Sequence, residues 1–219
     1  MVASLKALST GYTGGYHMNP NSSDYYTGKV QDRGQWYGNG VSALHLPTSV
    51  TKEHFEQILL GNNPLTGDSL VSNRSKNRCP GVDVTFSVPG DVSAVWVVAN
   101  DFEKARIERC VKRSVQETLD FAEKVLDLCR FGRGGAIKEK ANLVSALFMH
   151  FCNRNGDPQL HVHAVIAIVV QDKSGKWRHL NTGEIFAWTR TLGTLFRSAL
   201  SKNLANEMSI ETVQAKDEN

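Results

Sequence analysis

Apolar residues recur along this chain at two different spacings, and each spacing predicts a different kind of element. Between Val82 and Val88 they alternate with polar residues, which is typical of a half-buried strand. From Asp101 to Arg130 they recur mostly at steps of three and four residues, which predicts a long amphipathic helix. Asp101 suits the start of that helix, and we expect Pro89 and Gly90 to turn the chain between the two elements.

Apolar stretches in the second half of the chain predict a group of strands followed by a helix. Leu143–Cys152 and Leu160–Val170 flank the turn-forming residues Asn153–Asp157, and this spacing favours an antiparallel pair of strands. A further strand is expected at Trp177–Leu180, and a helix around Ile185–Met208.

The remaining segments carry signals for one short helix and for loops. Ser49–Gly61 has apolar residues on one side and closes on a glycine, so it predicts a short capped helix. Residues 10–40 are rich in Gly, Tyr, Asn, Ser and Asp, which favours loops. Residues 130–140 combine glycines with basic residues and predict a flexible loop, either packed against a DNA backbone or serving as a plain surface linker. We expect residues 211–219 to form a flexible tail.

Length and composition are those of one globular domain. The 219 residues leave room for one active site, and a net charge of +3 permits a nucleic-acid partner without requiring one. The four cysteines contain no Cys-x-x-Cys pair, so they indicate reduced thiols rather than a zinc cluster or a disulfide framework. No stretch approaches the roughly 20 apolar residues that a membrane span needs. We therefore expect a cytoplasmic protein without membrane insertion.

Three histidines are candidate metal ligands. His161 and His163 alternate along a predicted strand, so both imidazoles project from one face, with backbones about 6.6 Å apart. By the same parity, antiparallel pairing with the neighbouring strand could bring His150 beside them. Three neutral imidazoles suit a divalent transition ion with open positions for a substrate. An isolated His-x-His on a strand is more often a half-buried polar pair, so it is the third histidine that favours a metal site.

An acidic residue and a group of tyrosines are further candidates. Asp83 interrupts an apolar strand, either as the carboxylate that orients an imidazole or as a residue that caps a turn at the strand edge. Tyr16, Tyr25 and Tyr26 lie near the amino terminus, where their rings could anchor the segment to the core. A phenol could instead act as a nucleophile, if a metal polarises a phosphate and a nearby group accepts the proton. The composition of the segment fits both interpretations.

Four motifs in sequence order carry a family resemblance. They are Asp24-Tyr25-Tyr26, Trp36-Tyr37-Gly38-Asn39-Gly40, Gly81-Val82-Asp83-Val84-Thr85-Phe86-Ser87-Val88-Pro89 and Asp157-Pro158-Gln159-Leu160-His161-Val162-His163-Ala164-Val165. Together they resemble the relaxase domain of the MobF-type conjugative relaxases, which belong to the HUH endonucleases. The similarity extends from about Tyr16 to about Leu204.

This resemblance implies an α+β fold in which a central antiparallel sheet, flanked by helices, carries the three-histidine metal site. Residues 1–210 would form the relaxase domain. The resemblance implies that His150, His161 and His163 bind a divalent ion, with Mg²⁺ or Mn²⁺ expected and Zn²⁺ or Ni²⁺ as alternatives. The implied activity is site- and strand-specific nicking of single-stranded DNA at a plasmid transfer origin, followed by religation.

The resemblance also implies roles for the other candidates. Tyr16 would attack the scissile phosphate and form a 5′-phosphotyrosine, with Tyr25 as the alternative nucleophile and Tyr25 or Tyr26 serving a second transfer. Asp83 would orient a histidine or accept the tyrosine proton. The implied partners are transfer-origin DNA and other relaxosome proteins. The domain would act in the bacterial cytoplasm and could travel with the DNA into a recipient cell.

Two departures from the family pattern keep other functions open. Tyr16 is followed by His17 where the family has paired tyrosines, and Pro89-Gly90-Asp91-Val92-Ser93 replaces Pro-Lys-Ser-Val-Ser, so that a lysine is lost and a carboxylate is gained. A catalytically impaired module that only binds single-stranded DNA is therefore the main alternative. A metal-dependent hydrolase or oxygenase acting on a small molecule is the other, and in that case the tyrosines would be incidental.

Overall fold

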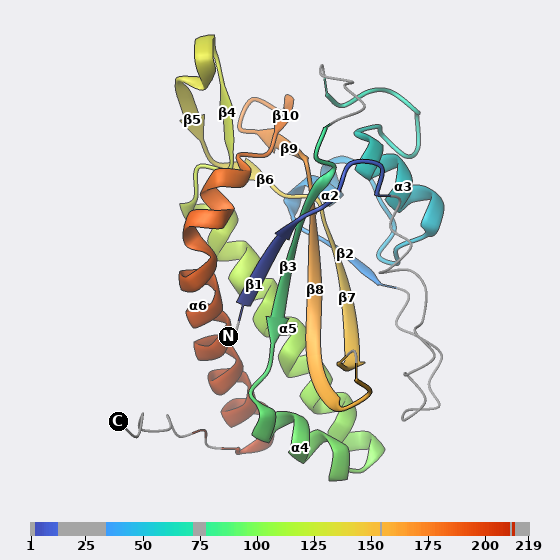
Figure 1. The fold of residues 1–219 in the computed structure, drawn as a ribbon, viewed down its shortest axis with the longest axis vertical. Coiled ribbons are helices and arrows are strands. Elements are labelled where there is room, and N and C mark those ends of the chain that lie inside the picture. Colours follow the sequence, from blue (N-terminus) through green and yellow to red (C-terminus); the bar gives the residue numbers. More distant parts are fainter. Residues whose placement is uncertain (1–2, 13–33, 72–77, 154, 211, 213–219) are drawn as a thin grey trace.

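A five-stranded sheet forms the centre of the computed structural model, which describes residues 3–12, 34–71, 78–153, 155–210 and 212. Every neighbouring pair of strands in this sheet is antiparallel. In spatial order the strands are β1 (Ala3–Ala7), β3 (Gly81–Ser87), β8 (Pro158–Ala167), β7 (Ser145–Cys152) and β2 (Gln35–Tyr37). The expected α+β class with a central antiparallel sheet is confirmed (Figure 1).

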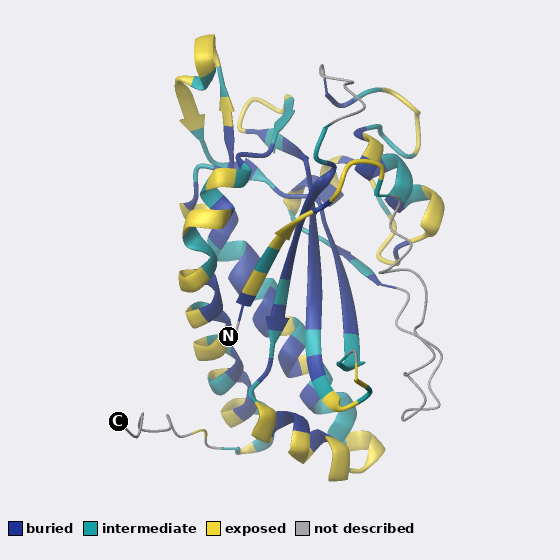
Figure 2. Cartoon of the chain, viewed as in Figure 1, coloured by how far each residue is buried: buried dark blue, intermediate teal, exposed yellow. Residues whose placement is uncertain are grey.

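Two long helices cover one face of this sheet (Figure 1). α5 (Asp101–Val125) and α6 (Thr182–Met208) pack against each other, and α6 also contacts β1 and β3. The ring centroids of Phe86 on β3 and Phe196 on α6 lie 5.2 Å apart. Because successive side chains of a strand alternate between faces, Val84 shares the helix-covered face with Phe86. The buried residues accordingly follow the strands and the inner sides of the two helices (Figure 2).

The helix predicted from Asp101 to Arg130 is confirmed over most of its length, but it ends at Val125. Its N-cap is Asn100, whose side chain accepts a hydrogen bond from the backbone N–H of Glu103 at 3.0 Å, while the Glu103 carboxylate accepts one from the Asn100 backbone at 3.1 Å. The apolar residues that follow Val125 are buried outside the helix, which is why the helical pattern overstated its length. α6 differs at its other end and begins three residues before the predicted Ile185.

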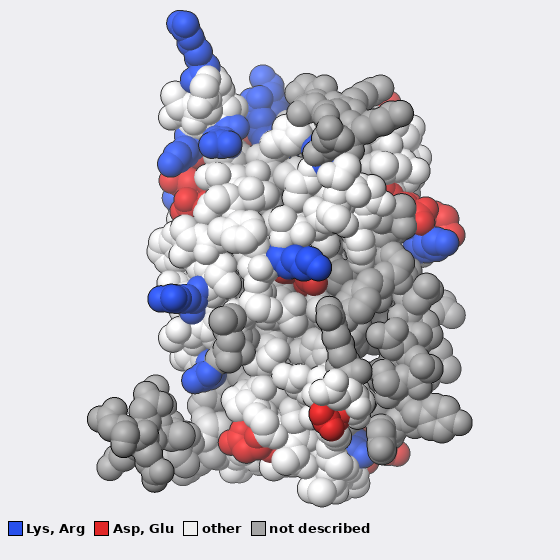
Figure 3. Space-filling model, in the orientation of Figure 1, with Lys and Arg blue, Asp and Glu red and all other residues white. Residues whose placement is uncertain are grey.

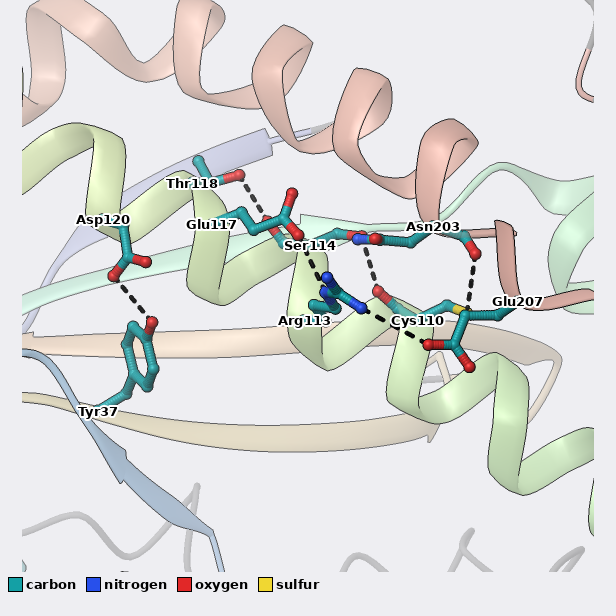
Figure 4. A network of polar contacts seen from close by, with 9 residues as sticks. All are labelled: Tyr37, Cys110, Arg113, Ser114, Glu117, Thr118, Asp120, Asn203 and Glu207. Carbon is teal, nitrogen blue, oxygen red and sulfur yellow. Dashed lines mark hydrogen bonds and ion pairs between the residues drawn. The ribbon is translucent and has the colours of Figure 1, made fainter. Parts of the chain in front are cut away.

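A buried polar network joins α5 to α6 (Figure 4). Asn203 Nδ2 donates to Ser114 Oγ at 3.0 Å, and Ser114 Oγ donates to the carbonyl oxygen of Cys110 at 2.6 Å. Cys110 Sγ in turn lies 3.5 Å from the carbonyl oxygen of Asn203, and Arg113 pairs with Glu207 at 3.5 Å nearer the surface. Polar groups are tolerated inside this interface because each of these groups has a hydrogen-bond partner.

Two smaller sheets extend beyond one end of the central sheet (Figure 1). β9 (Val169–Asp172) pairs with β10 (Trp177–His179) and with β6 (Ala141–Asn142). β4 (Cys129–Phe131) and β5 (Ile137–Glu139) form a hairpin that projects from the body of the molecule.

The projecting hairpin corrects the prediction of a flexible loop at residues 130–140. Gly132, Gly134 and Gly135 have φ values of 80°, 67° and 72°, which permit the tight turn η2 (Arg133–Gly135) between the two strands.

The predicted strands keep their antiparallel pairing but change their bounds. The strand expected at Leu160–Val170 is divided, because the chain leaves the central sheet after Ala167 and pairs again as β9. β7 begins two residues after the expected Leu143, and β10 ends one residue before Leu180.

A second correction is α4 (Gly90–Val98), which lies where the sequence predicted a turn. Pro89 directly precedes this helix. The valines that follow do not recur at the three- and four-residue steps that would predict an amphipathic helix. Tertiary contacts hold the helix instead. Trp96 stacks on Phe151 with ring centroids 5.2 Å apart, and Ser93 Oγ accepts a hydrogen bond from the backbone of Leu160 at 3.1 Å.

The opposite face of the central sheet is covered in part by α3 (Lys52–Leu60), which confirms the predicted short helix. Thr51 caps its start, and Gly61 ends it with φ of 80°. Phe55 on α3 packs against Phe148 on β7 with ring centroids 5.3 Å apart. Another short helix, α2 (Asn39–Ala43), directly follows β2. Among the described residues, no helix has the length and apolar character to cross a membrane.

Candidate metal centre

Three histidines converge on the face of the sheet opposite α5 and α6. His150 on β7 lies directly opposite His161 on β8, as the antiparallel parity predicted, and His163 follows two residues later on β8. The ring centroids are 4.8 Å apart for His150 and His163, 5.1 Å for His161 and His163, and 5.2 Å for His150 and His161. One ligand nitrogen from each ring lies within 4.8 Å of the other two. The three side chains can therefore reach a single ion.

Hydrogen bonds fix which nitrogen of two rings carries the proton. His161 Nδ1 lies 2.9 Å from the carbonyl oxygen of Gln159, and His163 Nδ1 lies 2.8 Å and 3.0 Å from the two carboxylate oxygens of Asp83. A carbonyl oxygen can only accept a hydrogen bond, and so can an ionised carboxylate, so both Nδ1 atoms act as donors. The neutral ring then keeps its Nε2 lone pair, which is the atom that binds a metal.

Burial favours the neutral form that a metal ligand requires. Burial lowers the pKa of His161, and this effect exceeds the opposing effect of its hydrogen bond to the Gln159 carbonyl. His163 and Asp83 are 7% and 8% exposed, so their hydrogen bond is largely shielded from water. Thr85 adds a further contact, with Oγ1 3.2 Å from His163 Nδ1. This donor set fits a divalent ion with nitrogen ligands.

The strands place each of these side chains by alternation. Asp83 and Thr85 are two residues apart on β3 and share its face opposite the helices, and Thr85 lies directly across from His163. At the other side of the cluster, the pairing of β7 with β8 becomes irregular just after His150, at a bulge before Cys152. Bulges of this kind commonly redirect a strand beside a functional site.

The structure brings together four of the seven residues singled out in the sequence, namely Asp83 and the three histidines. Tyr16, Tyr25 and Tyr26 lie outside the described residues. A different tyrosine, Tyr37, donates its hydroxyl to Asp120 at 2.8 Å. Burial first, and then this hydrogen bond, raise the pKa of Tyr37 well above its ordinary value, so its phenol stays protonated.

Two residues of the site were not predicted. Gln159 acts through its backbone carbonyl, so no property of its side chain could have indicated it. Thr85 could have been found, because it shares a strand face with Asp83, but a threonine on a strand is common for reasons of packing alone.

A histidine cluster with this geometry, built on a central antiparallel sheet, defines the class of the molecule as a metal-binding α+β domain. The family model described as TrwC relaxase matches residues 9–219. The chain therefore belongs to the TrwC relaxase family, as the resemblance to the MobF-type conjugative relaxases anticipated.

Relatives of known identity agree with this assignment. The multifunctional conjugation protein TraI of Escherichia coli (strain K12) is 30% identical, over 93% of this chain and 12% of TraI. A second TraI from Escherichia coli is 32% identical, over 81% of this chain and 10% of that protein. The present chain thus spans about an eighth or less of the length of these curated relatives.

Solved structures give the same result for the fold. The metal-bound conjugative relaxase TrwC in complex with oriT DNA is 32% identical with a TM-score of 0.78, over 93% of this chain and 70% of that chain. TrwC complexed with a 27-mer DNA that comprises the recognition hairpin and the cleavage site has a TM-score of 0.77 at 32% identity, over 99% and 73% of the two chains. The histidine cluster and the metal-bound relative together support a divalent metal at this site.

Proposed function

We propose that this chain is a relaxase domain, which nicks one strand of single-stranded DNA at a plasmid transfer origin by tyrosine attack and later religates it. The observation that carries the proposal is the convergence of His150, His161 and His163, with hydrogen bonds from Nδ1 of two of the rings to Gln159 and Asp83. Membership of the TrwC relaxase family and the oriT complexes of TrwC support the choice of DNA as substrate.

The three histidines would hold the ion, Mg²⁺ or Mn²⁺ in the first place and Zn²⁺ or Ni²⁺ as alternatives. When bound, such an ion supplies charge stabilisation to the oxygens of the scissile phosphate. The protein's own contribution is orientation, because Gln159 and Asp83 fix the ring nitrogens that face the ligand position. Both Asp83 oxygens lie within 3.0 Å of His163 Nδ1, which favours orientation over acceptance of the tyrosine proton as the role of this carboxylate.

Tyr16 is the proposed nucleophile, with Tyr25 as the alternative and Tyr25 or Tyr26 as the group for a second transfer. The phenol gives up its proton to a base as its oxygen forms a bond to phosphorus, the bond from phosphorus to the 3′ oxygen breaks, and this oxygen takes up a proton and leaves as a hydroxyl. The 5′ phosphate remains bonded to the tyrosine, so attack by a 3′ hydroxyl can reverse the reaction. In sequence these tyrosines lie between β1 and β2, the two edge strands of the central sheet.

The setting of the reaction forms the remaining part of the proposal. Other relaxosome proteins are expected partners at the origin, and the domain would act in the cytoplasm and accompany the DNA into a recipient cell. Support for these partners comes from the relatives, which are described as conjugation proteins.

Covalent trapping tests the proposal. Labelled single-stranded oligonucleotides from the transfer origin are incubated with the protein and Mn²⁺ or Mg²⁺, and the products are separated on a denaturing gel. We expect an EDTA-sensitive protein–DNA adduct that disappears in Tyr16→Phe. Tyr12→Phe serves as the matched control, because this tyrosine does not belong to the proposed nucleophile set. An adduct that persists in Tyr16→Phe and is lost in Tyr25→Phe would move the nucleophile within the same mechanism.

Tight DNA binding without any adduct would support the second candidate, a catalytically impaired module that binds single-stranded DNA. The observation that favours this second candidate is the acidic residue Asp91. This residue stands where the family has a lysine-containing motif, and its carboxylate accepts a hydrogen bond from the backbone of Val92 at 2.9 Å at the start of α4. The lysine of the family motif corresponds to Gly90, so its attraction toward phosphate is lost there, and the carboxylate of Asp91 adds repulsion.

A further inference from the structure

The strand β3 presents a row of three polar side chains on the face of the sheet that carries the histidines. Asp83, Thr85 and Ser87 follow one another at steps of two residues, so all three project from this face. The first two contact His163, because its Nδ1 lies 2.8 Å from Asp83 Oδ2 and 3.2 Å from Thr85 Oγ1. Ser87 is the last residue of the row and of β3, and these contacts give it no role.

Backbone pairing brings Ser87 next to a proposed metal ligand. Ser87 lies directly across from His161 on β8. The adjacent pair carries the ladder hydrogen bond, because the Val88 N–H donates to the carbonyl oxygen of Leu160 at 3.1 Å. Hydrogen-bonded and non-hydrogen-bonded pairs alternate along an antiparallel ladder, and in the second kind the Cα atoms are only about 4.5 Å apart. Ser87 and His161 form a pair of this closer kind.

Thr85 and His163 show how near the side chains of such a pair can lie. They face each other two residues away on the same two strands, and Thr85 Oγ1 lies 3.2 Å from His163 Nδ1. His161 has no equivalent nitrogen for Ser87, because its Nδ1 lies 2.9 Å from the carbonyl oxygen of Gln159. The hydroxyl of the half-buried Ser87 makes no hydrogen bond within the described part of the chain. A hydroxyl donor beside the histidines is therefore available to a ligand.

A phosphate group is a ligand that requires such a donor. Its non-bridging oxygens share negative charge, so an ion that binds one of them leaves another to be stabilised by hydrogen bonds. Gly90 replaces the lysine of the family motif three residues after Ser87, so this chain lacks that cation. We infer that the Ser87 hydroxyl donates a hydrogen bond to a non-bridging oxygen of the scissile phosphate while the three histidines hold the ion. This inference rests on the proposed function.

Phosphorus NMR with inorganic phosphate tests the inference without DNA and without nicking. Mn²⁺ bound to an excess of protein shortens the relaxation time of phosphate that binds beside it, so a titration gives the dissociation constant of phosphate. We expect Ser87→Ala to weaken phosphate binding by about 10-fold, as the loss of a hydrogen bond to a charged group does. The Mn²⁺ affinity, measured by calorimetry, should stay unchanged, because Gln159 and Asp83 still orient the rings.

Two further variants show whether the hydroxyl itself is responsible. Ser87→Thr keeps the hydroxyl on a residue that strands accept readily, so it should restore most of the phosphate affinity. Ser4→Ala is the matched control. Ser4 is an exposed serine on β1 that lies across from Thr85, on the same face of the sheet but one strand further from β8. Its replacement should change neither the phosphate affinity nor the Mn²⁺ affinity.

Each contrary outcome has a separate meaning. Equal phosphate affinities for the unsubstituted chain and Ser87→Ala would overturn the inference and leave the proposed function standing. An equal loss in Ser4→Ala, or no recovery in Ser87→Thr, would also overturn it, since the effect would then not come from this hydroxyl. A parallel fall in Mn²⁺ affinity would make Ser87 a support of the histidines instead. Absence of phosphate binding beside Mn²⁺ in the unsubstituted chain would remove the inference, whereas only the absence of a covalent DNA adduct would remove the nicking activity.

Discussion

His163 Nδ1 donates a hydrogen bond to the carboxylate of Asp83. Replacing Asp83 by asparagine removes the negative charge of this acceptor and changes the shape of the side chain little. An ionised acceptor raises the basicity of a ligating imidazole and holds its orientation, and an amide does both less well. We expect Asp83→Asn to weaken Mn²⁺ binding by about 10- to 100-fold, as is usual for such partners of metal ligands. Calorimetric titration of the metal measures the effect.

Asp91→Asn is the matched control for this change. It also neutralises an aspartate, but at an exposed position where the side chain contacts the backbone of Val92. Equal Mn²⁺ affinities for the two variants would show that Asp83 has no specific influence on the ligands.

Residue positions in the metal centre could be predicted to the extent that side-chain alternation determines them. The spacing of His161 and His163 placed both on one face, and antiparallel pairing brought His150 opposite His161. The alternation of side chains along a strand does not predict the contacts of main-chain atoms, so the role of the Gln159 carbonyl was not predicted. Glu123 on α5, whose carboxylate accepts a hydrogen bond from the backbone of Asn39, was missed for a different reason. It looks like one more charged position on an amphipathic helix, and only the tertiary fold shows that it is buried against Asn39.

Among the elements, the projecting hairpin of β4 and β5 is the one with the clearest electrostatic character. Arg130, Arg133 and Lys138 are exposed on it, and lysines and arginines gather on and beside this part of the surface (Figure 3). Arg178 from β10 lies over the ring of Phe131 at 4.4 Å and ties the hairpin to the neighbouring sheet. A ribbon of two strands with basic side chains can approach the DNA backbone closely.

Alanine replacement of Arg130, Arg133 and Lys138 should therefore weaken DNA binding and make it less sensitive to salt. Each lost phosphate contact is expected to reduce the slope of log affinity against log salt by roughly 0.7 to 0.9. Fluorescence anisotropy with origin DNA at several salt concentrations measures both quantities. Lys124→Ala with Lys202→Ala removes exposed charge from α5 and α6 as a control, and an equal loss of slope there would refute a specific role for the hairpin.

The elements that the sequence pattern predicted well are those whose own periodicity is strong, namely α3, α5, α6 and the paired strands β7 and β8. α4 could not be predicted from its pattern, because Val92, Val95, Val97 and Val98 favour no helical face and only contacts such as Trp96 with Phe151 stabilise it. β1 and β2 were also missed. Both are short edge strands, whose pairing depends on partners far away in the sequence.

At the scale of the whole molecule, metal binding should be linked to global stability. The three histidines come from β7 and β8, which also carry much of the buried core, so the unfolded chain cannot present them together. We expect Mn²⁺ at 100 times its dissociation constant to raise the free energy of unfolding by about 2.7 kcal/mol. Thermal or urea unfolding with Mn²⁺ and with EDTA measures the difference, which the triple replacement of the histidines by alanine should abolish.

The pH dependence of this stabilisation follows from the burial of the ligands. Protons compete with the metal for each imidazole, and an ordinary histidine becomes protonated below about pH 6.5. Because burial lowers the pKa of His161, its neutral form persists below that pH in the folded protein, so protonation of His161 opposes metal binding only at a lower pH. The metal-dependent increase in the free energy of unfolding should then disappear as the pH falls through the lowered pKa of His161. A gain that stays constant as the pH falls through the lowered pKa of His161 would mean that the metal binds to groups other than this imidazole.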